Sequence, residues 1–291
     1  EDPKRAARRL REVADIAPHK RAILGRLADL YRRLGFYDRL EAILKRLASL
    51  YETPAELRAT YLELARHLIH RAGELAEARH WLQKALKIAD DDPDILETLG
   101  ESYALAGRPL RAAKAFGAAA RGADSDGQAR RAAELHERVA RLWDEELEDA
   151  EQALLSIRRA IQLDERAADD PTVERMEYLA RAATLCERLG RVDDAIGYWT
   201  DVVATAELVG GGPAGREHPR RRAHRRLAAI YEQRGRLESA ALHWETLVDV
   251  DPTTAAAAER LAEVYKKIGR PRPLVRSEER GVGKECIVKC R

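Results

Sequence analysis

The stretch "ILETLGESYALAGRPLRAAKAFGAAA", Ile95–Ala120, places small and large residues at fixed distances from one another. Its spaced small residues are Gly100, Gly107, Ala112 and Ala119. An amphipathic helix needs only an apolar stripe, so these distances require a further explanation. A small residue in mid-helix lets a second helix approach closely, and a glycine suits the left-handed residue that ends a helix. The stretch therefore predicts two helices that join at Gly107 and pack as a hairpin.

The same spacing recurs along the chain. The template residues are Leu96, Leu99, Gly100, Tyr103, Gly107, Ala112, Phe116 and Ala119, and a second copy has His224, Leu227, Ala228, Tyr231, Gly235, Ala240, Trp244 and Leu247. Copies starting at Leu24 and Leu179 keep identical spacing, whereas those starting at Tyr61 and His136 carry one additional residue between their helices. Because a hairpin cannot bury its apolar stripe alone, we expect neighbouring copies to share one core.

Composition supports an all-helical chain. Good helix formers dominate, aromatic residues make up only 5%, and almost no stretch alternates like a strand. No apolar run approaches the roughly 20 residues that a membrane-spanning helix needs. No secretory signal opens the chain, which begins at Glu1 inside a predicted helix, so we expect a fragment. The compartment stays open, with the cytoplasm slightly favoured.

This pattern resembles the tetratricopeptide-repeat family, whose 34-residue unit is a helix–turn–helix. The resemblance implies an all-α fold, a right-handed α-solenoid of stacked hairpins with a concave face. Six repeats are predicted, and they span residues 20–52, 54–90, 93–124, 128–165 (with a one-residue insertion), 172–208 and 220–252. The remaining segments are a partial repeat over 1–18 (second helix only), a flexible connector over 209–219, a truncated repeat over 254–275 and a tail over 276–291.

The tail departs from the rest in composition. Residues 276–286 match ten of eleven positions of a translated sequencing-adapter oligonucleotide, R-S-E-E-R-R-V-G-K-E-C, with Gly281 as the exception. We therefore expect residues 276–291 to be non-native. The formal charge of the whole chain is +2, and the tail contributes five basic and three acidic residues, so the remainder has no net charge. Charge alone thus implies neither a basic nor an acidic partner.

Helix starts are marked by capping signals. Thr53–Glu56 forms a capping box with a proline at the first helical position, and Asp92-Pro93 and Asp170-Pro171 repeat the cap-plus-proline signal. Glycine-containing stretches around Gly122–Gly127 and 209–219 predict irregular connections.

In this family the ligand groove is lined by first-helix positions outside the core. Carried onto this sequence, the resemblance implies a groove formed by Arg32, Arg33, Arg66, His70, Glu97, Glu101, Glu137, Arg141, Asp144, Arg222 and Arg225. The middle of this surface is acidic with little basic compensation, which would favour a partner with a basic segment. The alternative is that these charges are ordinary solvated helix faces. The family's lysine–asparagine clamp for peptide carboxylates is not expected, because these positions hold no asparagine.

Other chemistry is weakly represented. The basic cluster Arg220–Arg226 lacks interleaved aromatic residues, so no nucleic-acid partner is expected. His67, His70 and His80 have no fixed set of further ligands, so we predict no metal and no cofactor. Cys186 takes a core position and is expected to be a buried thiol. No nucleophile elbow, zinc-protease motif or dinucleotide fingerprint occurs, so an enzyme is not predicted.

The sequence thus favours a scaffold that binds a peptide or partner segment in its groove. Two alternatives stay open: a regulatory region of a larger enzyme or signalling protein, such as a kinase or transcription regulator, and an RNA-associated helical repeat. The identity of the partner and the oligomeric state are not predicted.

Overall fold

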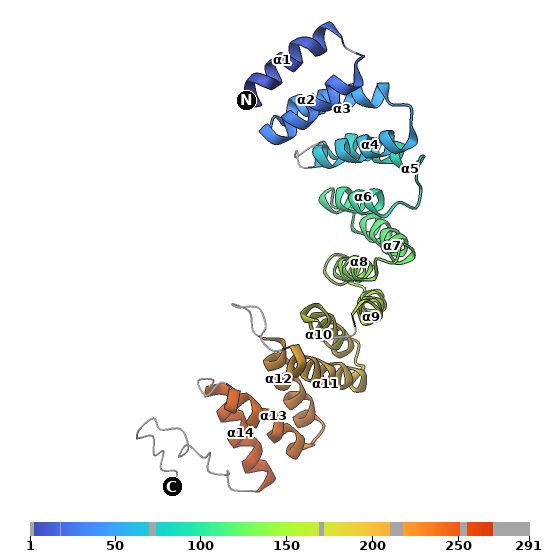
Figure 1. Ribbon diagram of the computed structural model, residues 1–291. Coiled ribbons are helices and arrows are strands. Elements are labelled where there is room, and N and C mark those ends of the chain that lie inside the picture. Colours follow the sequence, from blue (N-terminus) through green and yellow to red (C-terminus); the bar gives the residue numbers. More distant parts are fainter. Residues whose placement is uncertain are drawn as a thin grey trace. The chain divides into compact units, whose positions relative to one another are not determined.

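The computed structural model describes residues 3–17, 19–69, 74–168, 172–209, 218–250 and 255–269. Within these ranges the chain forms fourteen α-helices, one π-helical turn and no strand, so the predicted all-α fold is confirmed (Figure 1). The elements are α1 Pro3–Ile16, α2 Arg21–Leu34, α3 Tyr37–Leu50, α4 Pro54–Ile69, α5 Leu75–Leu86, α6 Pro93–Leu105, α7 Pro109–Ser125, α8 Ala129–Arg141, η1 Leu142–Glu146, α9 Ala150–Ala167, α10 Val173–Arg188, α11 Val192–Val209, α12 Pro219–Gln233, α13 Leu237–Val250 and α14 Ala255–Ile268. None of the described helices is long and apolar enough to cross a membrane. The chain divides into unit 1, Glu1–Tyr198, and unit 2, Trp199–Arg291.

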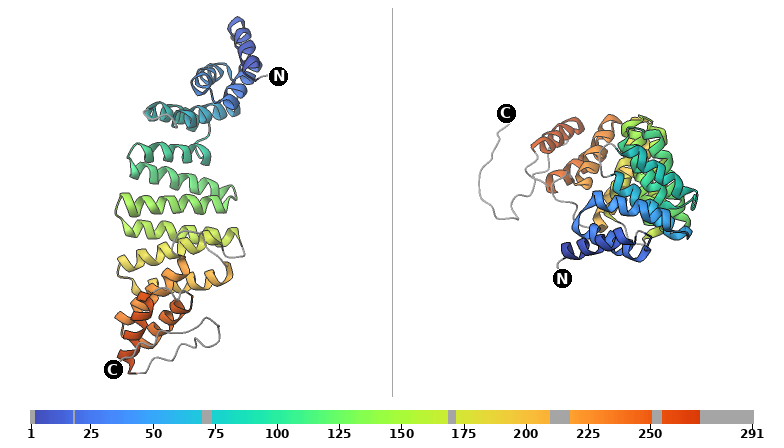
Figure 2. Two further views of the ribbon diagram at one scale, coloured as in Figure 1. Left: turned by 90° about the vertical axis from the view of Figure 1, so that its left-hand side faces the viewer. Right: turned by 90° about the horizontal axis from the view of Figure 1, so that it is seen from above.

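Unit 1 is a stack of helices in chain order. Each helix from α1 to α10 packs against the next, and Figure 2 shows the successive hairpins of this unit lying one upon another. The first helices of the hairpins are also neighbours, since α4 contacts α6 directly. This arrangement is the solenoid that the repeated spacing predicts.

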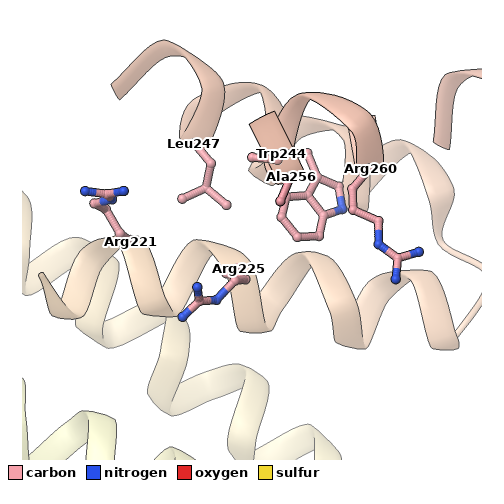
Figure 3. Close-up of a pocket in the computed structure, with 7 residues that line it drawn as sticks. Arg221, Arg225, Trp244, Leu247, Ala256 and Arg260 are labelled. Atoms are coloured by element: carbon pink, nitrogen blue, oxygen red, sulfur yellow. The ribbon is translucent and has the colours of Figure 1, made fainter. Parts of the chain in front are cut away.

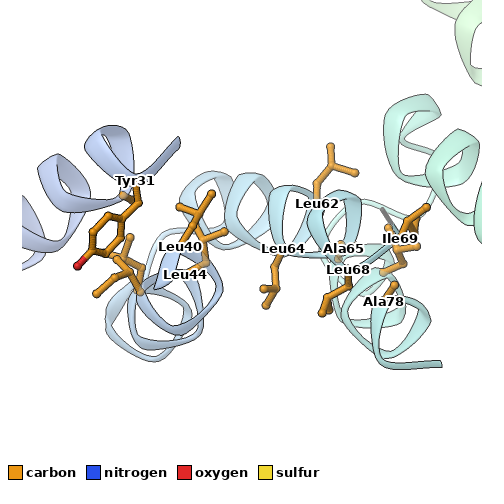
Figure 4. Close-up of a cluster of buried hydrophobic side chains, with 14 of the residues drawn as sticks. Tyr31, Leu40, Leu44, Leu62, Leu64, Ala65, Leu68, Ile69 and Ala78 are labelled. Atoms are coloured by element: carbon orange, nitrogen blue, oxygen red, sulfur yellow. The ribbon is translucent and has the colours of Figure 1, made fainter. Parts of the chain in front are cut away.

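One apolar core runs through the first seven helices of unit 1. Figure 4 shows part of it, with Leu40 and Leu44 of α3 and Leu64 and Leu68 of α4 among the buried side chains. Leu64 and Leu68 are fully buried, and truncating a leucine in such a position costs about 2–5 kcal/mol. The expectation that neighbouring hairpins share a core is therefore confirmed for this part of the chain.

The contact between Gly100 and Phe116 explains the spacing of the opening stretch. A Cβ atom added to Gly100 would lie 2.6 Å from the Phe116 ring, closer than real Cβ contacts allow. Only glycine lets the ring lie this close to α6, and Ala112 and Ala119 on α7 are fully buried beside it. Gly107 ends α6 in the left-handed conformation, with φ of 64°, as predicted.

The additional residue expected in 128–165 lies in a π-helical turn. The turn Leu142–Glu146 continues α8, and the Leu147 N–H donates to the Leu142 carbonyl five residues earlier. Glu148 follows with a positive φ of 53°, the one non-glycine residue in this conformation among the described residues. A π turn absorbs one residue without breaking the helix, and such turns are frequent at functional sites.

Two of the three predicted helix starts are confirmed. The Thr53 hydroxyl accepts the Glu56 N–H at 3.4 Å, and the Asp92 carboxylate accepts the Asp94 N–H at 2.9 Å. Residues Asp170 and Pro171 lie outside the described residues, and the cap of α10 is Thr172, which accepts the Arg175 N–H at 3.0 Å.

The predicted irregular loop at Gly122–Gly127 is wrong over most of its length. Helix α7 continues to Ser125, and only Asp126 and Gly127 form a turn. Gly122 allows close packing here, because a Cβ atom on it would lie 2.8 Å from the Asp91 carbonyl oxygen. Most of the predicted connector 209–219 and all of the tail 276–291 lie outside the described residues.

The helices α12, α13 and α14 of unit 2 pack in the same order. Their core contains Ala228 of α12, Ala240 and Trp244 of α13, and Leu261 of α14. Ala228 occupies the place that Gly100 has in the repeat at 93–124, and Trp244 occupies the place of Phe116. This correspondence allows the two regions to be compared residue by residue.

Candidate functional site

Ion pairs between successive first helices cover the predicted groove of unit 1. Arg32 of α2 binds Glu63 of α4 at 2.6 Å, and Arg138 of α8 binds Glu97 of α6 at 2.8 Å. Arg188 of α10 continues the series through its ion pair with Asp144 of η1. We call this series the arginine ladder; it comprises Arg32, Arg58, Arg131, Arg138, Arg181 and Arg188 with the acidic partners Glu63, Asp92, Asp94, Glu97, Glu101, Glu137, Asp144 and Glu145.

The expected lack of basic compensation is therefore wrong. Glu97 is bound by both Arg131 and Arg138, and Glu101 is bound by Arg138 at 3.2 Å. The sequence contained a signal for this pairing. Arg131 and Arg138 lie on the first helix of the following hairpin, one repeat after the acidic residue Glu97 that they bind. An acidic surface paired in this way has lost most of its preference for a basic partner.

The other predicted groove residues of unit 1 differ in their surroundings. Arg66 lies 3.3 Å from the Thr98 hydroxyl and 4.0 Å from Asp94. Arg141 and Arg181 share the Glu137 carboxylate, at 2.6 and 3.7 Å. Arg33 is exposed, and His70 lies outside the described residues.

A hollow of about 260 Å³ in unit 2 has a different character (Figure 3). Three guanidinium groups and four apolar side chains line it: Arg221 and Arg225 of α12, Trp244 and Leu247 of α13, and Ala256, Ala257 and Arg260 of α14. Figure 3 shows the Trp244 ring and Leu247 between arginines contributed by two helices. The indole N–H donates to Glu232 at 2.6 Å, which fixes the ring in this position.

The basic cluster at the start of α12 separates into two groups. Arg222 lies over the Trp199 ring with its guanidinium carbon 5.6 Å from the ring centroid, and Arg220 binds Glu207 at 3.3 Å. Arg221 and Arg225 line the hollow instead. Of the two predicted groove residues in unit 2, only Arg225 is thus part of the hollow. The sequence interpretation missed Arg221, Arg260 and the role of Trp244, which its pattern assigns to the core.

The corresponding place in unit 1 is closed. Arg138 has the same repeat position as Arg260, and its guanidinium lies 4.2 Å from the centroid of the Phe116 ring. Glu97 and Glu101 hold Arg138 there through their ion pairs. Unit 2 has Arg225 in the place of Glu97 and Ala229 in the place of Glu101. Arg225 cannot hold Arg260 over the ring as Glu97 holds Arg138, and Arg260 instead binds Glu263 of its own helix at 3.0 Å, so the aromatic ring borders a hollow in unit 2.

The structure describes His67, His80 and Cys186 of the histidine and cysteine residues considered in the sequence analysis. His67 is largely buried and His80 is exposed, so these two do not share one surface. Cys186 is fully buried, as predicted, and burial raises the pKa of its thiol, which keeps it in the unreactive protonated form.

Comparison with known proteins supports a tetratricopeptide-repeat fold. A tetratricopeptide-repeat profile matches residues 23–58, which include most of α2 and all of α3. No curated protein sequence matches the chain. The C-terminal part of a TPR repeat-containing protein from Cytophaga hutchinsonii aligns with a TM-score of 0.64 and 15% identity, over 89% of this chain and 95% of that chain. BtubC from P. vanneervenii aligns with a TM-score of 0.50 and 18% identity, over 74% of this chain and 92% of that chain.

At these identities the two structures are evidence for the fold alone. The profile match supplies the family for one hairpin, and the repeated spacing extends the same pattern to the others. The profile match over residues 23–58 and the fold of the chain together identify a tetratricopeptide-repeat architecture.

Proposed function

We propose that this chain is a non-catalytic scaffold whose main anchoring site for a partner protein is the hollow between α12, α13 and α14. Tetratricopeptide repeats commonly mediate protein–protein interactions, and a preformed surface suits this role because little ordering entropy is lost on binding. The observation that carries the proposal is an apolar floor, Trp244 and Leu247, surrounded by three arginines.

The chemistry of the hollow selects its occupant. An apolar side chain would displace water from the Trp244 and Leu247 surfaces, and aspartate or glutamate residues beside it would reach the guanidinium groups. The volume, about 260 Å³, lies just below the range of typical small-molecule pockets and suits a side-chain anchor. We therefore propose a partner segment in which an apolar residue is flanked by acidic residues. This replaces the basic partner segment that the sequence analysis expected from the acidic groove residues.

Fluorescence anisotropy with short labelled peptides tests this assignment. Acidic peptides with a central leucine or phenylalanine should bind about tenfold more tightly than basic peptides with the same apolar residue. Arg225→Glu should remove this preference, because the new carboxylate both repels the peptide and attracts Arg260 over the Trp244 ring.

Arg226→Glu is the matched control, because Arg226 is exposed on the same helix, does not line the hollow, and changes the net charge equally. If peptide binding weakens equally in Arg225→Glu and Arg226→Glu, the preference comes from the net charge of the chain and the hollow is rejected as the binding site. A preference for basic peptides that disappears in Glu97→Lys would instead assign binding to the arginine ladder.

A further inference from the structure

Three carboxylates from two hairpins meet on the side of unit 1 formed by α3 and α5. Glu41 of α3, Glu77 of α5 and Glu74, the residue before α5, each place one oxygen within 4.8 Å of the others. Lys45 lies among them, with its ammonium nitrogen 2.9 Å from Glu41 and 2.6 Å from Glu77. Three negative charges and one positive charge leave this cluster with a formal charge that a divalent cation would neutralise.

His67 of α4 supplies an independent indication of a ligand. Its side chain is only 9% exposed, and its Nε2 atom is buried without a hydrogen-bond partner among the residues that the structure describes. The same atom lies 3.9 Å from a Glu41 oxygen, so it faces the carboxylate cluster. A buried ring nitrogen without a partner costs free energy unless something binds it.

We propose that His67 Nε2 and the carboxylates of Glu41, Glu74 and Glu77 bind a divalent transition-metal ion, with Zn²⁺ as the best match. One imidazole nitrogen with carboxylate oxygens is a donor set that suits zinc, whereas magnesium and calcium take oxygen ligands. Tetrahedral zinc with bonds of about 2.0–2.1 Å separates its ligand atoms by about 3.3 Å. The three carboxylate oxygens lie within 4.8 Å of one another and His67 Nε2 lies 3.9 Å from Glu41, so these atoms must move closer together to reach that value. His67 lies outside the group of three carboxylates, so its ring must turn farther toward Glu74 and Glu77.

Lys45 is the internal competitor for this site. Its ammonium group holds Glu41 and Glu77 together, and its side chain is 37% exposed, so it can turn toward solvent when the ion takes over its charge. The bound ion would connect α3, α4 and α5, and thereby fix two successive hairpins to one another.

Isothermal titration calorimetry with zinc chloride tests the proposal on the full chain. Cys286→Ser and Cys290→Ser should be present in every variant, because tail thiols would bind zinc themselves. Zinc should bind at one site and raise the midpoint of thermal unfolding, whereas magnesium should not. His67→Gln should weaken binding by about tenfold or more, since loss of a ligand costs at least as much as loss of an outer-shell contact.

Lys45→Met should strengthen zinc binding, because it removes the competing charge and leaves all four ligands in place. This gain of affinity keeps the test valid even if His67→Gln folds poorly. His80→Gln is the control for exposed histidines and should bind zinc like the parent chain. The proposal is overturned if Lys45→Met leaves the affinity unchanged or lowers it, or if His80→Gln loses as much affinity as His67→Gln.

Discussion

Two aromatic residues at the same repeat position, Phe116 in unit 1 and Trp244 in unit 2, have opposite surroundings. Phe116 is covered, with Gly100 below it and the Arg138 guanidinium 4.2 Å from its ring centroid. Trp244 forms part of the floor of a hollow that Arg260, the counterpart of Arg138, borders from one side. The backbone pattern is shared, so the difference comes from a few charged and small residues on the first helices.

Under the proposed function, this difference separates the residues that stabilise the solenoid from those that recognise a partner. In unit 1 the first-helix charges are used between repeats, as in the two ion pairs from Glu97 to Arg131 and Arg138. In unit 2 an arginine stands where Glu97 stands in unit 1, and Arg260 pairs with Glu263 of its own helix at 3.0 Å. Under the proposed function, carboxylates of a partner would approach the three guanidinium groups that line the hollow.

The largest effect is expected at the glycine below Phe116. Gly100→Ala should destabilise the chain by about 1–3 kcal/mol, because the new methyl group would lie 2.6 Å from the ring and the core would have to shift. The midpoint of thermal unfolding, measured by circular dichroism, should fall by several degrees. Gly25→Ala is the matched control, because a Cβ atom there meets nothing within 4 Å and alanine favours the helix.

An unchanged midpoint in Gly100→Ala would contradict the packing argument. It would mean that the close approach of α7 to α6 is not needed and that Ala228 and Gly100 are interchangeable. The comparison between the two regions would then depend on charge alone.

The sequence predicted the fold well because its signals are local and repeated. Gly35, Gly107, Gly190, Gly235 and Gly269 all have the predicted positive φ. The π turn after α8 was harder to predict, since one additional residue can be absorbed in a loop or in a helix, and residue types do not decide between them.

The candidate site was less accessible from sequence, because it depends on pairs between helices. The acidic residue Glu97 is visible in the sequence, but its neutralisation by Arg131 and Arg138 depends on the rotation of two helices about their axes. Trp244 fits the core pattern and is only 7% exposed, yet it also lines the hollow. Spacing identifies a core position and cannot show that one edge of the same ring borders open space.

A smaller effect is expected when unit 1 is given the charge pattern of unit 2. Glu97→Arg removes two ion pairs and repels Arg138 from the Phe116 ring, and it should lower the free energy of unfolding by about 1–2 kcal/mol. Urea unfolding measures this loss, and added salt should reduce it because the new interactions are repulsive. Glu101→Gln, which removes a single more exposed pair, should cost about 0.5 kcal/mol or less.

If Glu97→Arg were as stable as the parent chain, the ladder would contribute nothing to the closure of unit 1. The hollow of unit 2 would then need an explanation other than the arginine at position 225. If Glu97→Arg instead gained binding of acidic peptides, the arginine at this repeat position would be sufficient to create the proposed binding preference in unit 1.

The smallest of the three main effects, taken for a single residue, is a dependence on pH that the two regions should share. Burial lowers the pKa of His136 in unit 1 to about 4, with Arg159 and Arg121 adding to the shift and Asp124 opposing it. Burial also lowers the pKa of His224 in unit 2 to about 4, with His243 and Arg220 adding to the shift. The unfolded chain binds these protons near pH 6.5, so the stabilisation is present above that value and is lost as the pH falls from about 6.5 toward 4.

After allowance for solvent screening, each histidine should cost about 1 kcal/mol at about pH 5.5. Urea unfolding at about pH 7.5 and pH 5.5 should therefore give a lower midpoint at the acid value, and His136→Gln and His224→Gln should each reduce that difference. His80→Gln should leave the difference unchanged, because His80 is exposed on α5. If both buried-site variants kept the full difference, the acid sensitivity would come from carboxylates, and the arginine ladder of unit 1, where most of the described ion pairs lie, would be its source.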